Sequence, residues 1–373
     1  MSFFRFFWKS NELFWTYLAV ACARLENPKA FRPCFHRELA MSLSNRFQSS
    51  FPWLSLSAYL FVLTVLNQSI VLSQIVPSAT QRHALEKPKE TLKILFAGDI
   101  MLDGGPGNYV ANGKDPFEAC ASLFEGVDVS IGNLECVLGR GGEQQLKPYV
   151  FRGPADSPRF LKKYFQAVSL ANNHSMDYGP GGMVEMLSLL EREKLPYFGG
   201  GLNIKQASSP FVIEIKGHKI AILGFNEFKA ADYAATKNTA GNSPLSDIAV
   251  VNAVKNAREK LGCNVVIPFL HWGQEMMPAP RPDQVKSARK WIDSGATAVI
   301  GAHPHVTQTI DTYHGSPIIY SLGNFAFDYF PVDPLEWVGW LAIIEIEPSG
   351  SVGVEIKTII LDPAGCPKPA SPD

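Results

Sequence analysis

Short apolar runs alternate with amphipathic stretches through residues 91–365 of the 373-residue chain. Continuous apolar runs are typical of buried strands, whereas apolar residues three and four positions apart indicate helices. The strand-like runs are 92–97, 127–131, 167–170, 211–215, 219–225, 265–269, 298–300, 306–311, 316–321, 339–346 and 352–361. The helical patterns are 116–125, 156–164, 182–194, 246–261 and 282–293. This alternation predicts an α/β fold with β-sheet inside and helices outside.

Two local signals refine these elements. Lys216-Gly217-His218 separates two strand-like runs and predicts a hairpin turn. Ser246 precedes a helical pattern and is expected to be its N-cap, because a serine hydroxyl accepts hydrogen bonds from the first free backbone N–H groups.

The chain before residue 91 differs in character. Residues 1–51 form an aromatic-rich N-terminal extension, and Met41 within it begins a stretch that resembles an ordinary signal segment, so a start at Met41 is an alternative. Residues 52–76 contain no charge, which fits a transmembrane anchor or a signal segment; a buried core helix is the alternative. Residues 77–90 are a polar linker, and 366–373 form a tail.

Charge and cysteine content narrow the function classes. Arg37 and Arg46 precede the apolar segment, so the positive-inside rule places the following domain outside the cytoplasm, membrane-anchored or secreted. The net charge of -1 gives no basic excess for nucleic-acid binding. None of the six cysteines forms a CxxC pair, which argues against a zinc knuckle. Whether Cys120 and Cys136 pair is open.

Side chains that bind metals follow five of the strand-like runs. The loops are Gly98-Asp99-Ile100-Met101, Gly132-Asn133-Leu134-Glu135, Ala171-Asn172-Asn173-His174, His271-Trp272-Gly273-Gln274-Glu275 and Gly301-Ala302-His303-Pro304-His305. Open α/β sheets bind ligands at the carboxyl ends of their strands, so these loops are expected to converge. The mixture of oxygen and imidazole ligands suits Zn, Mn or Fe.

Each loop alone also fits a purely structural role. Asp99 fits a turn or helix cap, Asn172-Asn173 fits a left-handed loop, and His271 beside Trp272 fits a packed histidine. His303 and His305 fit this less well, because residues two apart in an extended stretch project to the same side. The joint occurrence of all five loops favours a metal centre.

The motifs resemble the CapA family, the capsule and poly-γ-glutamate biosynthesis proteins, whose domain is related to calcineurin-like metallophosphatases. The matching segments span about 92–328: 96–102, 132–135, 169–179, 270–275, 301–306 and 320–325. The resemblance implies a metallo-dependent phosphatase-like, four-layer αββα sandwich with two mixed sheets face to face.

The resemblance also implies roles for individual residues. Asp99 resembles the first metal carboxylate, Glu135 stands where the phosphatases place a bridging aspartate, and Asn173 resembles the metal-binding amide. His174 resembles the adjacent acid or oxyanion-stabilising group. The remaining implied ligands are His271, His303 and His305, and the residues expected to support them or to contact substrate are Asn133, Asn172, Asp177, Glu275 and Asn324. The phosphatases carry a histidine at the position of Met101, so one or two divalent ions are both open.

Three functions follow from the resemblance. The first is a metal-dependent hydrolase of poly-γ-glutamate or a capsule precursor, tethered to the membrane or secreted. The second is a metallophosphoesterase on a phosphorylated polymer or nucleotide, against which Met101 speaks. The third is a non-enzymatic assembly or export factor that partners a membrane synthase through the apolar N-terminal segment. An anionic polymer calls for a basic groove, for which the candidates, equally explained as solvated charges, are Arg140, Lys147, Arg152, Lys162 and Lys163.

Overall fold

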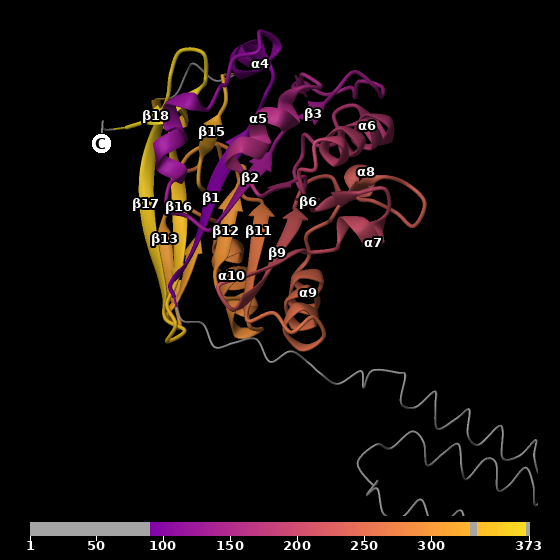
Figure 1. Ribbon diagram of the computed structural model, residues 1–373. Helices are drawn as coiled ribbons and strands as arrows, with labels where there is room; N and C mark the ends of the chain where they lie inside the picture. The colour runs from indigo at the N-terminus through magenta and orange to yellow at the C-terminus, as the bar shows by residue number, and fades with distance from the viewer. Residues whose placement is uncertain (1–89, 329–333, 371–373) are drawn as a thin grey trace, which may run out of the picture. The chain divides into compact units, whose positions relative to one another are not determined.

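A computed structural model describes residues 90–328 and 334–370 (Figure 1). The N-terminal extension, the apolar segment 52–76 and residues 77–89 of the linker lie outside the described residues. Within the described part of the chain, no helix combines the length and the apolar character needed to cross a membrane.

Two mixed β-sheets form the centre of the described domain. The larger has the order β18 (Pro367–Pro369), β17 (Val352–Leu361), β16 (Val338–Ile346), β1 (Leu92–Ile100), β2 (Val129–Leu134), β5 (Ala167–Ser169) and β6 (Tyr197–Phe198), with β15 (Asn324–Ala326) beside β1. The smaller has the order β13 (Ile310–Tyr313), β14 (Ser316–Ile319), β12 (Val299–Ala302), β11 (Val265–His271), β9 (His218–Asn226) and β8 (Phe211–Ile215).

Apolar side chains on alternate positions bind the layers together. Between the sheets, Ile94 and Phe96 of β1 belong to one buried cluster with Ile267 and Phe269 of β11. The rings of Phe96 and Phe269 meet edge to face, with centroids 5.5 Å apart. Leu95 lies between Ile94 and Phe96 in the sequence and faces the opposite side of its sheet, because successive side chains of a strand alternate.

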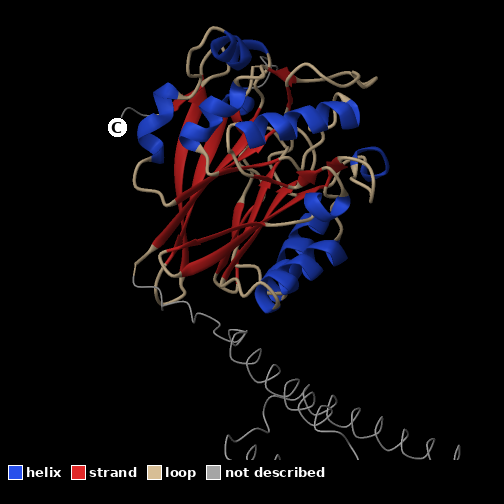
Figure 2. Cartoon of the chain, turned by 45° about the vertical axis from the view of Figure 1, so that its right-hand side comes forward, coloured by secondary structure: helices blue, strands red, loops and turns tan. Residues whose placement is uncertain are grey.

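Helices cover the two outer faces of the sheets (Figure 2). The larger sheet packs against the 3-10 helix η2 (Glu118–Phe124), α5 (Ser157–Tyr164) and α6 (Gly179–Arg192). The smaller sheet packs against α9 (Asp247–Glu259) and α10 (Pro282–Asp293). The four-layer αββα sandwich that the resemblance implied is therefore confirmed.

The remaining described elements are short and lie in the connections. They are α4 (Gly104–Ala111), β3 (Val137–Leu138), β4 (Arg152–Gly153), β7 (Gly200–Gly201), α7 (Ile204–Ala207), α8 (Ala230–Tyr233), β10 (Gly241–Asn242) and η3 (Pro334–Trp337). The sequence pattern indicated none of them, because they are too short to show a periodicity.

Parallel strands bring the candidate loops to one edge. β1, β2, β5 and β6 run parallel in the larger sheet, as do β9, β11, β12 and β14 in the smaller. The register places Asp99 opposite Asn133, and His271 opposite Ala302, which precedes His303. The carboxyl ends of these strands therefore hold the site.

Several sequence predictions hold in detail. The helix predicted over 282–293 has the bounds of α10. The side chain of Ser246 accepts a hydrogen bond from the backbone N–H of Ala249, as an N-cap does. Lys216 and Gly217, with φ of 50° and 75°, join β8 to β9 in a two-residue turn, and a positive φ at both central positions is the mark of a type I′ hairpin.

Other sequence predictions were wrong. Only the end of the strand predicted over 306–311 forms, because the chain passes from His303 to Thr309 as a loop beside the site. The helix predicted over 116–125 is a 3-10 helix whose buried residues, Cys120 and Leu123, are three apart, as that helix requires. The stretch assigned to the tail contains β18, which pairs with β17. Cys120 and Cys136 are buried and free.

Candidate metal centre

Six polar side chains that resemble metal ligands converge at the carboxyl edge of the two sheets. Asp99 lies in β1, Glu135 follows β2, Asn173 follows β5 and His271 ends β11, while His303 and His305 follow β12. All are buried except Asn173, which is half-buried. The structure therefore brings together residues that lie up to about two hundred positions apart, as the separation of Asp99 and His303 shows.

One group of ligand atoms surrounds Nε2 of His271. This nitrogen lies 2.7 Å from Oδ1 of Asn173, 3.0 Å from Nδ1 of His303 and 3.2 Å from Oε1 of Glu135. Glu135, His271 and His303 each offer an atom within 4.8 Å of the others. A carboxylate oxygen, an amide oxygen and two imidazole nitrogens, all atoms that can bind a metal, thus lie close together.

A second group shares Glu135 with the first. Oδ2 of Asp99 lies 3.4 Å from Nδ1 of His305, and Nε2 of His305 lies 4.0 Å from Oε1 of Glu135. Asp99, Glu135 and His305 also each offer an atom within 4.8 Å of the others. Two adjacent groups that share a carboxylate suit two ions held side by side.

The electrostatics of Glu135 test whether a cation fits. Both of its carboxylate oxygens are buried and lack a hydrogen-bond partner. Burial and the neighbouring charge of Asp99 raise the pKa of Glu135 well above its ordinary value. A buried carboxylate without a partner is costly, and a bound cation removes that cost. The residues present therefore fit a divalent metal.

Two of the three histidines at the centre are in the form that metals bind. Burial lowers the pKa of His271 to about 3. Burial, together with the neighbouring imidazoles, lowers the pKa of His303 well below its ordinary value. Burial opposes ionisation of Asp99, but His305, His271 and Asn133 together hold its pKa below the ordinary value. Metals bind ionised carboxylates and neutral imidazoles, a condition that His271 and His303 meet. Burial lowers the pKa of His305, but the hydrogen bond and charge of Asp99 raise it above its ordinary value, so a metal would displace a proton there.

Asparagine side chains support these candidate ligands. Asn133 donates from Nδ2 to Oδ1 of Asp99 over 2.7 Å. Asn172 donates from Nδ2 to Oδ1 of Asn133 over 3.1 Å, which extends the chain of contacts to the loop that carries Asn173. Oδ1 of Asn324 lies 2.9 Å from Nδ1 of His305. Contacts of this kind orient metal ligands.

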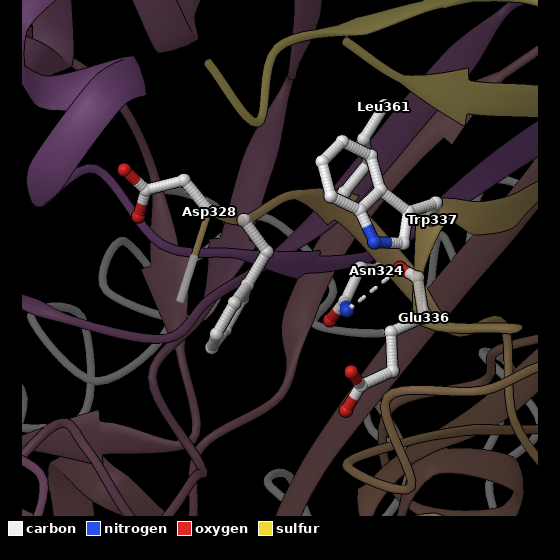
Figure 3. Close-up of a pocket in the computed structure, with 6 residues that line it drawn as sticks. Asn324, Asp328, Glu336, Trp337 and Leu361 are labelled. Carbon is white, nitrogen blue, oxygen red and sulfur yellow. Dashed lines mark hydrogen bonds between the residues drawn. The ribbon is translucent and has the colours of Figure 1, made fainter. Parts of the chain in front are cut away.

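Asn324 also borders a small pocket beside the centre. Its Nδ2 donates to the backbone oxygen of Glu336 over 3.1 Å, as the dashed line in Figure 3 marks. The lining residues are Asn324, Phe327, Asp328, Glu336, Trp337 and Leu361. Asp328 accepts a hydrogen bond from the backbone N–H of Gly105 at the start of α4, so this carboxylate stabilises the N-terminus of that helix.

His174 lies beside the ligands and contacts an acid. Its Nδ1 lies 2.7 Å from Oδ2 of Asp177 and 3.4 Å from Nζ of Lys147. Lys147 forms an ion pair with Asp177 and donates to the backbone oxygen of Asn173 over 2.8 Å. Burial lowers the pKa of His174, and Asp177 opposes that shift. Asp177 therefore serves His174 and Lys147, and no described metal-ligand group includes it.

Glu275 differs from the buried ligands. Its side chain is 55% exposed, and its Oε1 lies 4.0 Å from Nε2 of His303. With His303 and His305 it forms a third set of atoms within 4.8 Å. The carboxylate is thus at the solvent side of the centre.

His303 and His305 do not lie in an extended stretch, so the prediction that placed them on one side of such a stretch was wrong. Their φ angles are 99° and 59°. Both are left-handed, a conformation that is unfavourable for residues with a Cβ and is concentrated at functional sites. The backbone N–H of His303 donates to Oδ2 of Asp99 over 3.1 Å, which holds this loop against β1.

Met101 is buried, and its sulfur accepts a hydrogen bond from the backbone N–H of Asp103 over 3.1 Å. The side chain of Met101 therefore packs in the core and stabilises a turn. The phosphatases that the sequence resembles have a histidine at this position. Met101 is not among the three side chains of the group of Asp99, Glu135 and His305.

Two side chains at the centre had no specific role in the sequence predictions. Lys147 was expected only as one of five residues of a basic groove. Among the described contacts, it is the one of those five that reaches the site. Arg152 instead stacks on Tyr178, and Lys163 pairs with Asp115. Phe228 lies with its ring centroid 4.0 Å from that of His303. Phe228 follows the end of β9, so an inspection of all the loops that follow predicted strands would have included it.

Comparison with known proteins agrees with these motifs. Residues 93–329 match the family model described as bacterial capsule synthesis protein PGA_cap. The chain is 33% identical over 249 residues to the PGA biosynthesis protein CapA of Bacillus subtilis (strain 168), covering 64% of each chain. It is 34% identical over 252 residues to the capsule biosynthesis protein CapA of Bacillus anthracis, covering 65% of this chain and 61% of that one. The matches thus span less than two thirds of either relative.

Among solved structures, the NAD nucleotidase of Haemophilus influenzae is similar, with 13% identity, a TM-score of 0.41, and coverage of 76% of this chain and 54% of that chain. The expected resemblance to CapA proteins is confirmed by the sequence matches. Because the family model covers more than half of the chain, this protein belongs to the bacterial capsule synthesis protein family PGA_cap.

Proposed function

We propose that this protein is a metal-dependent hydrolase of an anionic capsule polymer, and that it cleaves the γ-linked amide of poly-γ-glutamate. The observation that carries the proposal is the buried carboxylate of Glu135, which accepts no hydrogen bond and is shared by two groups of ligand atoms. The Bacillus relatives, which are named for capsule and PGA biosynthesis, support the substrate class.

The residues divide between two candidate ion positions. Glu135, Asn173, His271 and His303 would hold one divalent ion, and Asp99, Glu135 and His305 would hold a second. Mn, Zn and Fe all accept this mixture of oxygen and nitrogen ligands. A metal bound there would supply Lewis-acid polarisation of the bond and activation of water.

His174 transfers a proton in this proposal. Asp177 accepts from Nδ1 of His174, which fixes the ring and leaves Nε2 as the nitrogen available to substrate. Hydrolysis of an amide forms a bond from water oxygen to the carbonyl carbon and breaks the C–N bond. While Nδ1 donates to Asp177, Nε2 of His174 carries no proton, so in this proposal it takes a proton from the attacking water and passes it to the leaving nitrogen. Lys147 holds Asp177 and the backbone of Asn173 in place, so that His174 and the amide of Asn173 keep their positions.

The test measures polymer length. The purified full chain is stripped of metal, reloaded separately with Mn, Zn or Fe, and incubated with γ-linked glutamate polymer, whose length is followed by size-exclusion chromatography. Shortening of the polymer is expected in the wild type and not in His303→Ala. His314→Ala is the matched control, because the His314 side chain is 70% exposed and outside the centre. No cleavage with any of the three metals would contradict the proposal.

A phosphoesterase is the second candidate. The sharing of Glu135 favours it, because two adjacent ions suit phosphoryl substrates. Turnover of generic phosphomonoesters or phosphodiesters, together with an intact glutamate polymer, would select it over amide hydrolysis. Tight metal binding without turnover of either substrate class would select an assembly or export factor.

We further propose that residues 52–76 tether the domain to a membrane or direct its secretion, and that the domain works outside the cytoplasm. The support is the uncharged sequence of the segment and the arginines before it. A tethered domain could then act beside a membrane synthase. Fractionation of cells, with protease added to intact cells, tests this; a chain that is protected in the cytosolic fraction would contradict it.

A further inference from the structure

The segment from Asn226 to Tyr233 forms part of the wall of the metal centre. Asn226 ends β9 directly opposite His271 in the register of the smaller sheet. Phe228 then brings its ring centroid to 4.0 Å from that of His303 and 5.9 Å from that of His271. This segment therefore lies directly beside two of the candidate ligands.

Hydrogen bonds hold this segment in place. The buried side chain of Asn226 donates to the backbone oxygen of Phe228 over 3.0 Å and accepts from its N–H over 3.1 Å. Glu227 accepts from the N–H of Gly273 over 2.7 Å and pairs with Arg281 over 2.5 Å. Lys229 has φ 45° and ψ 46°, a left-handed conformation, and precedes the short helix α8.

Two ammonium groups meet at one tyrosine ring of this segment. Nζ of Lys229 and Nζ of Lys147 each lie 5.5 Å from the ring centroid of the buried Tyr233. The two lysines come from separate loops that both border the centre. Lys147 in turn lies 3.4 Å from Nδ1 of His174, so Tyr233 connects Lys229 to the neighbourhood of the proton donor.

The charges around Tyr233 do not balance. Lys147 is paired with Asp177. Lys229 is exposed, and none of the ion pairs among the described residues involves it, so no described carboxylate compensates its charge. Two ammonium groups that both contact one ring make the surroundings of that ring attractive to an anion.

We propose that Lys229, with Lys147 and Tyr233, binds an oxyanion of the substrate, namely the carboxylate next to the bond that is cleaved. This inference rests on the proposed amide hydrolysis. In a γ-linked glutamate polymer, the carbon attached to each amide nitrogen carries a carboxylate. A polymer with its amide at the metal centre therefore presents a carboxylate at short range. Lys229 supplies the uncompensated charge, while Lys147 stays with Asp177.

The experiment measures binding separately from cleavage. The metal-loaded full chain is titrated with a γ-linked glutamate oligomer in a calorimeter, for wild type, Lys229→Gln and the matched control Lys237→Gln. Lys237 is an exposed lysine a few residues further along the same connection. Lys229→Gln is expected to weaken binding by about tenfold, because a charge-assisted hydrogen bond is lost. Lys237→Gln should bind like wild type, and all three proteins should hold the same amount of metal.

Further arms identify the oxyanion and separate this proposal from the proposed function. Methyl esterification of the α-carboxylates should weaken binding to the wild type. The affinity of the esterified oligomer for the wild type should be no higher than that of the unesterified oligomer for Lys229→Gln. Binding of inorganic phosphate through Lys229, without oligomer binding, would overturn the carboxylate assignment. Lys229-dependent binding without cleavage would contradict the proposed hydrolase activity and support the carboxylate subsite. Cleavage with equal affinity and equal KM in Lys229→Gln would remove the subsite and keep the hydrolase.

Discussion

Oδ2 of Asp177 lies 2.7 Å from Nδ1 of His174, three residues earlier in the same loop. The other carboxylate oxygen pairs with Lys147, whose side chain is only 10% exposed. Asp177 also accepts a hydrogen bond from the backbone N–H of Phe151 over 2.7 Å. One buried carboxylate thus orients His174 and compensates a lysine from a separate loop.

The pair of Lys147 and Asp177 is expected to be strongly coupled. Asp177→Asn leaves a nearly buried ammonium without its counter-charge, and should lower the free energy of unfolding by about 3 kcal/mol. Lys147→Met leaves the carboxylate with its contacts to His174 and Phe151 but without its counter-charge, and should also lower the free energy of unfolding. The double variant should cost clearly less than the sum, because neither charge remains. Urea unfolding of the metal-free proteins measures the cycle, and additive costs would show that the two residues are not coupled.

Glu135→Gln should separate metal binding from stability. The substitution removes one of two buried neighbouring carboxylates, so the metal-free protein should gain about 1 kcal/mol. The wild type should be strongly stabilised by added Mn²⁺, since binding to the folded state alone adds stability, whereas the variant should gain little. Thermal unfolding in EDTA and in Mn²⁺ measures both effects. A wild type that no divalent ion stabilises would contradict the metal centre.

Met101→His should raise the number of ions bound. The group of Asp99, Glu135 and His305 has three described side chains, and the substitution places an imidazole at the position where the phosphatases have one. Metal analysis after gel filtration is expected to show a higher metal-to-protein ratio than in wild type. Met101→Leu is the control, because it keeps the apolar volume without a ligand. Equal ratios in Met101→His and Met101→Leu would refute this expectation.

Gly98→Ala should destabilise the fold around Asp99. A Cβ at this position would meet the backbone oxygen of Gly323 at 1.9 Å, where Asp99 N–H also bonds. Backbone cannot swing away as a side chain can, so the expected loss is about 3 kcal/mol or more. Gly353→Ala in β17 is the matched control, since its Cβ meets nothing closer than 3.9 Å. Chemical denaturation compares them, and a neutral Gly98→Ala would show that β1 can move.

His218 should make stability fall in mild acid. This residue is buried, its Nε2 lacks a hydrogen-bond partner, and burial lowers its pKa from 6.5. The unfolded chain therefore binds a proton that the folded chain resists, so the contribution of His218 is present above about pH 6.5 and is lost as the pH falls through the folded pKa.

His218→Leu removes this proton linkage. The difference in melting temperature between wild type and variant is expected to shift in favour of the variant when the pH falls from about 7.5 to about 5, a range that spans the ordinary histidine pKa. A constant difference across that range would show that His218 does not contribute to the acid sensitivity.

The sequence pattern was sufficient for elements whose own residues specify them. The helix of 282–293 and the turn at Lys216-Gly217 are local, because spacing and chain stereochemistry decide them. The pattern failed where contacts with distant residues decide the conformation. A strand was predicted from Val306 onward, but a loop continues there. In this loop His303 and His305 have left-handed φ angles, and the hydrogen bond from the His303 N–H to Asp99 holds the loop against β1.

The sequence by itself determined the α/β class, the strand-end loops and the kinds of ligand they carry, because periodicity and residue chemistry are properties of the local chain. Only the tertiary structure decided which atoms meet: Glu135 shared by two groups, Lys147 on Asp177, Phe228 against His303, and Lys229 over Tyr233. These contacts depend on the register of parallel strands and on loops far apart in the sequence, and distance along the chain carries no information about either.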